Sequence, residues 1–203
     1  MSQLTDRDFK TIAFTFKRAF GDVHLFRNHF KTGTVPLALI GFKTGRLDWE
    51  TVGRRCAAER QHGRLRDPLC RYPQGLALLY LGTYQPERHA AGALNTLGNV
   101  RVELNAGRHL LAGSPGDYFR GDSEPWLLFL QRQIEGIEHD PAMPGSLRPF
   151  PRAGLLATRW QIASEEGNPA ASSLKQTLLT ELPYAMLSDG AADWSFWAGG
   201  ELF

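Results

Sequence analysis

The chain has 203 residues, of which 42% are hydrophobic, so it holds enough apolar sequence for one substantial core and is not an intrinsically disordered chain. Its first residues carry charges of both signs, so we expect no secretory signal, and no apolar run approaches about 18 residues, so we expect no membrane-spanning helix. We therefore expect a cytoplasmic protein whose two cysteines stay reduced. The formal net charge of +2 conceals a basic first third, because residues 1–72 hold 14 Lys and Arg against 7 Asp and Glu (+7), whereas residues 73–203 hold 9 against 14 (−5).

Residues 5–20 have the clearest helical pattern in the chain. Thr5 is suited to the N-cap, Asp8 follows at the spacing of a capping box, and Gly21 comes after the last turn. Apolar side chains recur at helical spacing along one face: Phe9, Ile12, Ala13, Phe16 and Phe20. The sequence therefore predicts an amphipathic helix that forms part of the core.

The tetrapeptide Phe-Lys-Thr-Gly occurs twice, at residues 30–33 and 42–45, on either side of the apolar run 35–40. Each copy is typical of a turn with a glycine free to adopt positive φ, so we expect a short strand or a buried turn between them. One interpretation is that the two Lys-Thr-Gly turns offer backbone N–H groups, a hydroxyl and an ammonium to phosphates. The alternative is that a turn-forming tetrapeptide occurs twice by chance. Neither copy completes a Walker A loop.

Residues 46–71 contain seven arginines and both cysteines. We expect a helix from an N-cap at Asp48 to about Arg60, with Trp49 and Cys56 facing the core. If the guanidinium groups share one face, they form a cationic surface that can follow a sugar-phosphate backbone. The alternative is a solvated helix face with Arg–Glu pairs of small energetic value, and a GC-rich genome alone also favours arginine codons.

The rest of the chain predicts a sheet and two more helices. Alternating or β-favouring residues indicate strands at 76–84, 100–104 and 155–162, and the aromatic tail is typical of a closing edge strand. Helices are expected to begin at Asp122 or Ser123 and at Ser173. A Pro/Gly-rich passage, residues 143–154, is interpreted as a linker.

Together these patterns predict an α+β fold, in which a basic helical N-terminal third packs on a mostly antiparallel sheet with two further helices. The sequence divides into a basic helical region, residues 1–72, and an α+β region, residues 73–203. The length favours one compact globular unit over two separate domains.

Catalytic and metal motifs are mostly absent from the sequence. No G-x-G-x-x-G, H-E-x-x-H or paired C-x-x-C occurs, so no cofactor is predicted. Four candidate zinc ligands exist, but only two have a short ligand spacing, so we predict no metal site; the four are His24, His29, Cys56 and Cys70. An enzyme site assembled from His24, His29, Asp117 and the cluster at 135–140 stays an alternative.

The charge asymmetry leads to the functional hypothesis. We expect a non-enzymatic subunit of a larger bacterial-type assembly, and we expect this subunit to contact DNA or RNA through its arginine-rich surface. Its expected partners are nucleic acid and other protein subunits, and no membrane. The alternative is a structural assembly subunit that makes only protein contacts. The predicted phosphate-binding residues are Lys31, Lys43, Arg46, Arg54, Arg55, Arg60, Arg64, Arg66 and Arg71.

Overall fold

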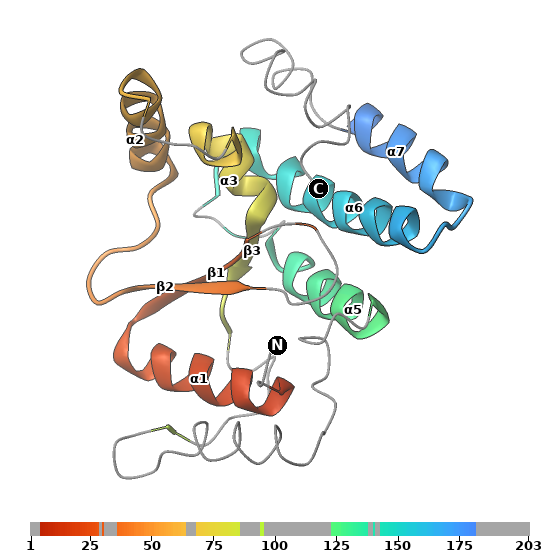
Figure 1. Ribbon diagram of the computed structural model, residues 1–203. Coiled ribbons are helices and arrows are strands. Elements are labelled where there is room, and N and C mark those ends of the chain that lie inside the picture. Colours follow the sequence, from red (N-terminus) through yellow and green to blue (C-terminus); the bar gives the residue numbers. More distant parts are fainter. Residues whose placement is uncertain are drawn as a thin grey trace. The chain divides into compact units, whose positions relative to one another are not determined.

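The computed structural model describes residues 5–28, 30, 36–63, 68–85, 94–95, 123–137, 140 and 143–181. Within these residues six α-helices and a three-stranded sheet form an α+β fold, which confirms the predicted class (Figure 1). The chain divides into two compact units. The first unit comprises Met1–Leu47 and Leu81–Gln133, and the second comprises Asp48–Tyr80 and Ile134–Phe203.

Helix α1 (Asp6–Ala19) opens the first unit and has the predicted capping box. The Thr5 side chain accepts a hydrogen bond from the Asp8 backbone N–H, and the Asp8 carboxylate accepts one from the Thr5 N–H. Phe9 is buried and meets Phe129 of helix α5 (Ser123–Ile134) edge-to-face, with 5.7 Å between the ring centroids. Aromatic pairs of this kind contribute beyond the area that they bury, so this contact fixes α1 against α5.

Strand β1 (Asp22–Arg27) lies at the centre of the sheet, in the order β2-β1-β3. It pairs antiparallel with β2 (Leu37–Phe42), in a register that runs from Asp22↔Phe42 to Arg27↔Leu37. Strand β3 (Tyr80–Thr83) flanks its other edge, and the Tyr84 N–H donates to the Val23 carbonyl at 2.8 Å. The sequence predicted a strand or a buried turn near β2 but missed β1.

A glycine in β2 lets helix α1 approach the sheet closely. A Cβ added at Gly41 would lie 2.5 Å from Phe20 Cγ and 2.6 Å from Phe16 Cε1. The absence of a side chain at this position therefore makes room for two aromatic rings of the α1 segment. At the following turn Gly45 has φ +81°, which is the positive φ expected for the second Phe-Lys-Thr-Gly turn.

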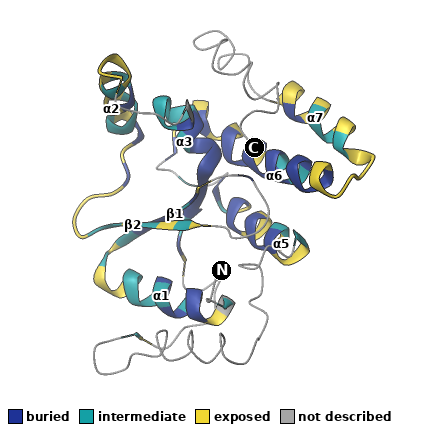
Figure 2. Cartoon of the chain, in the orientation of Figure 1, coloured by how far each residue is buried: buried dark blue, intermediate teal, exposed yellow. Residues whose placement is uncertain are grey.

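The described part of the second unit is mainly helical and is organised around α6 (Pro149–Glu165), which packs against α3 (Pro73–Leu79) and α7 (Ala170–Glu181). Most of the α6 side chains are buried, as the largely dark blue ribbon of α6 in Figure 2 shows. A helix that buries this many of its side chains belongs in a core, and its exposed side carries Arg152. The other described elements of this unit are α2 (Trp49–Gln61), η1 (Pro68–Arg71) and η5 (Gly145–Leu147).

Several predictions in this unit are wrong. Residues 155–162 are helical rather than a strand, and residues 143–154 contain η5 and the first turn of α6 rather than a linker. The predicted strand at 76–84 is α3 up to Leu79 and β3 beyond it. Helix α7 begins at Ala170, whose N–H donates to the Asn168 side chain, so Ser173 is not its cap.

The expected strand at 100–104 and the aromatic tail lie outside the described residues. None of the helices in the described segments is long and apolar enough to cross a membrane.

Candidate nucleic-acid interface

Helix α2 carries three of the predicted phosphate-binding arginines and begins at the predicted cap. The Asp48 carboxylate accepts hydrogen bonds from the Glu50 N–H at 3.0 Å and the Thr51 hydroxyl at 2.6 Å. These bonds, the one from Thr51 first, lower the pKa of Asp48. Arg54 Nη2 in turn donates to Thr51 Oγ1 at 2.8 Å, so the cap network also restrains the Arg54 guanidinium.

Two buried side chains hold α2 in the second unit. Trp49 is 4% exposed and packs edge-to-face on Tyr80, with ring centroids 5.4 Å apart. Cys56 is a buried free thiol, and its burial raises its pKa. Because these residues face the core, Arg54 and Arg55 lie on the outward side and are exposed.

Arg60 stacks on Tyr72, the residue that precedes α3. The guanidinium carbon lies 4.4 Å from the centre of the tyrosine ring, within the range of a cation–π contact. The helices approach each other here, because a Cβ added at Gly53 would lie 3.8 Å from Pro73. The contact orients a planar cation while Arg60 itself stays exposed.

The three α2 arginines do not form a single stripe. At about 100° per residue around a helix, Arg60 lies about 120° from Arg54 and about 140° from Arg55. Glu50 and Glu59 lie on the same helix, so the net charge of α2 is +1. Arg54 and Arg55 are therefore neighbours on the outward face, and Arg60 occupies the flank beside α3.

The other predicted residues are distributed over both units. Lys43 and Arg46 are exposed in the turn after β2, in the first unit, whereas Arg71 is half-buried at the end of η1, in the second. Lys31, Arg64 and Arg66 lie outside the described residues. Sequence reasoning missed Tyr72, for which the only local signal is its position directly after Arg71.

The predicted alternatives of a metal or catalytic site involve His24. This histidine is 1% exposed, with Nε2 2.7 Å from Asp22 Oδ2 and Nδ1 3.5 Å from Thr83 Oγ1, so both ring nitrogens face polar groups inside the first unit. Among the described residues no group of three His, Cys, Asp or Glu side chains is placed to hold a metal ion. Other members of the predicted enzyme site, His29, Asp117, Glu138 and His139, lie outside those residues.

Comparison with known proteins adds no relative. No family model, no curated protein and no solved structure matches the chain. Function is therefore inferred from the residues of this chain alone.

Proposed function

We propose that this protein is a non-enzymatic, cytoplasmic subunit of a larger assembly and binds the phosphate backbone of nucleic acid through α2. The observation that carries the proposal is the exposure of Arg54, Arg55 and Arg60 on a helix anchored by buried Trp49. Anchoring matters because a fixed helix presents its cations without first ordering the backbone that holds them.

Guanidinium groups suit this role chemically. Their N–H fork matches two phosphate oxygens at once, and they keep their charge throughout the physiological pH range. Contacts of this kind bind without reading the base sequence. The opposite charges of the two parts of the sequence, +7 and −5, further support protein partners within the assembly.

The proposal predicts binding that weakens steeply with salt. Two phosphate contacts, one each from Arg54 and Arg55 on the outward face, give a slope of about −1.8 in log affinity against log salt for duplex DNA, so affinity should fall roughly 12-fold between 50 and 200 mM salt. Fluorescence anisotropy with a labelled 20-base-pair duplex and a 20-nucleotide RNA, over several salt concentrations, measures the slope. Arg54→Ala/Arg55→Ala should reduce it by about 1.8.

The matched control is the double change Arg148→Ala/Arg152→Ala, which removes two exposed arginines of the same unit from α6 and its N-cap. It should leave the salt slope within error of the wild type, because these side chains lie outside α2. Equal losses in the two double variants would show that only net charge matters. Binding that ignores salt and both variants would contradict the proposal and favour an assembly subunit with protein contacts alone.

A further inference from the structure

A cavity of about 310 Å³ lies within the second unit, away from the residues of α2. It is lined by Ile134, Ile137, Arg148, Pro149, Pro151 and Arg152. This volume is at the lower end of the range found for small-molecule sites, roughly 300–1,000 Å³. The cavity is therefore large enough for a small organic molecule.

The interior of this cavity is apolar. Ile134 is 7% exposed, Ile137 is 2% exposed, and Pro151 is also buried. None of these three side chains carries a hydrogen-bonding group. An occupant therefore gains free energy here by removing hydrocarbon from water.

Two exposed arginines supply the charge of the lining. Within the described part of the chain, Arg148 is held through its Nε, which donates to the Met143 carbonyl at 3.3 Å, and its two terminal nitrogens are not used in that bond. Arg152 Nε lies 3.8 Å from the Glu181 carboxylate, and the two side chains are 67% and 39% exposed. Such an exposed, long ion pair contributes little and exchanges readily for another anion.

Arg148 and Arg152 also repel each other. They are four residues apart, so their like charges lie together on one face of the helix and destabilise the helix. The first turn of α6 contains no acidic residue, and the Glu181 carboxylate of α7 pairs with Arg152. A bound anion between the two guanidinium groups would remove this repulsion.

We infer that this cavity binds a small organic anion, with its apolar body against Ile134, Ile137 and Pro151 and its carboxylate or phosphate between Arg148 and Arg152. Guanidinium groups bind both kinds of headgroup through paired hydrogen bonds. The site is independent of the nucleic-acid surface, because it uses other residues and a ligand with a hydrocarbon body.

Isothermal titration calorimetry with four probe molecules tests the inference. Three of them have an eight-carbon chain, and the fourth has two carbons. Octanoate and octyl phosphate should bind with a Kd on the order of 1 mM or below, whereas octan-1-ol, which lacks the charge, and acetate, which lacks the body, should bind at least roughly tenfold more weakly. The ratio of the octanoate and octyl phosphate affinities identifies the preferred headgroup.

Variants locate the ligand. Arg152→Gln should raise the Kd of octanoate roughly tenfold, and Arg148→Gln should raise it similarly, as expected from the loss of one charge-assisted hydrogen bond each. Ile137→Gln places a polar group in the apolar interior and should weaken octanoate but not acetate. Arg54→Gln, an exposed arginine on α2, is the control and should leave the Kd unchanged.

Three results would overturn the inference: no saturable binding of either anion, equal binding of octanol and octanoate, or equal affinities for wild type and Arg152→Gln. Circular dichroism of each variant separates loss of the site from loss of the fold. Nucleic-acid affinity is measured separately for the same variants. Loss of octanoate binding and loss of nucleic-acid binding are therefore distinguishable, so one proposal can fail while the other still holds.

Discussion

Gly75→Ala should lower the free energy of unfolding by about 3 kcal/mol, the upper part of the range for overpacked cores. Gly75 is a buried residue of α3, and a Cβ built there would overlap the Leu69 carbonyl oxygen and lie 2.8 Å from Leu69 Cα. These atoms belong to the backbone of η1, so no rotamer change relieves the overlap. Urea denaturation followed by circular dichroism measures the loss.

Gly53→Ala is the matched control, because it makes the same change in another helix of the second unit. The added Cβ would lie 3.8 Å from Pro73, an ordinary van der Waals distance. The variant should gain about 0.5–1 kcal/mol, since alanine favours helix more than glycine does. If both variants shift stability in the same direction, close packing of α3 on η1 is not the cause.

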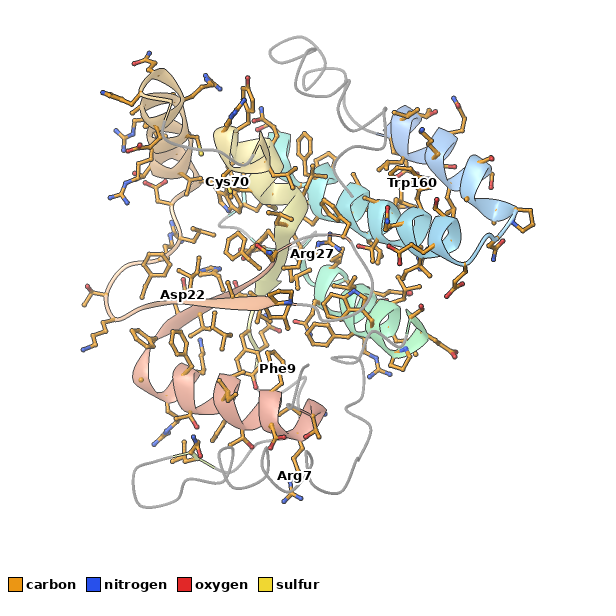
Figure 3. The ribbon with its side chains drawn as sticks, in the orientation of Figure 1. Arg7, Phe9, Asp22, Arg27, Cys70 and Trp160 are labelled. Atoms are coloured by element: carbon orange, nitrogen blue, oxygen red, sulfur yellow. The ribbon has the colours of Figure 1, made fainter. Side chains whose placement is uncertain are left out.

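Relative to Arg27→Met, the wild type should gain roughly 1 kcal/mol in free energy of unfolding between pH 7 and pH 10. Arg27 is 2% exposed at the end of β1, where Figure 3 labels it, and its guanidinium carbon lies 4.8 Å from the centre of the Phe30 ring. Burial lowers the pKa of Arg27 to about 9. At neutral pH the folded state therefore carries a buried charge, which the uncharged methionine side chain does not.

The sign of the effect follows from which state releases the proton first. Above about pH 9 the folded protein releases the Arg27 proton, while the unfolded chain still retains it. The unfolded state then binds more protons, so wild-type stability rises with pH relative to the variant. Denaturation at pH 7 and pH 10 measures this gain. Arg18→Met, at an exposed position of α1, controls for net charge and should show no such change.

The parts of the fold that the sequence predicted well are those governed by local hydrogen bonds. Thr5 and Asp8 form their capping box, and Asp48 caps α2, because these bonds join residues only two or three positions apart. The start of α5 at Ser123 was predicted for a similar reason, since Pro125 fits a first helical turn.

The elements that the sequence did not predict are those determined by packing against residues distant in the sequence. Strand β1 buries His24 and Arg27 together with apolar residues, so it lacks the alternation of a half-exposed strand. Helix α6 buries most of its residues, the polar Thr158 and Gln161 among them, so its sequence has no clear apolar stripe and residues 155–162 fit the alternation of a strand as well as a helix. Its prolines suggested a linker, although Pro149 is at the first helical position, where proline is tolerated.

The candidate sites show the same limit. The arginines of α2 were recognisable by type, but their directions follow from which side of the helix Trp49 and Cys56 bury. The stacking of Arg60 on Tyr72 depends on a turn between two helices, and the cavity joins Ile134 and Ile137 to residues 148–152 of another segment. Contacts between segments that are far apart in the chain produce no regular residue spacing, so the sequence alone does not reveal them.

The division of the chain into two interleaved units has a consequence for its synthesis. Each unit needs two separate segments, and the first unit is incomplete until residue 133 has left the ribosome, after residues 48–80 of the other unit have already emerged. Nascent chains of intermediate length therefore expose apolar surfaces that wait for later partners. For the same reason, a single protease nick anywhere between residues 48 and 133 separates the halves of at least one unit.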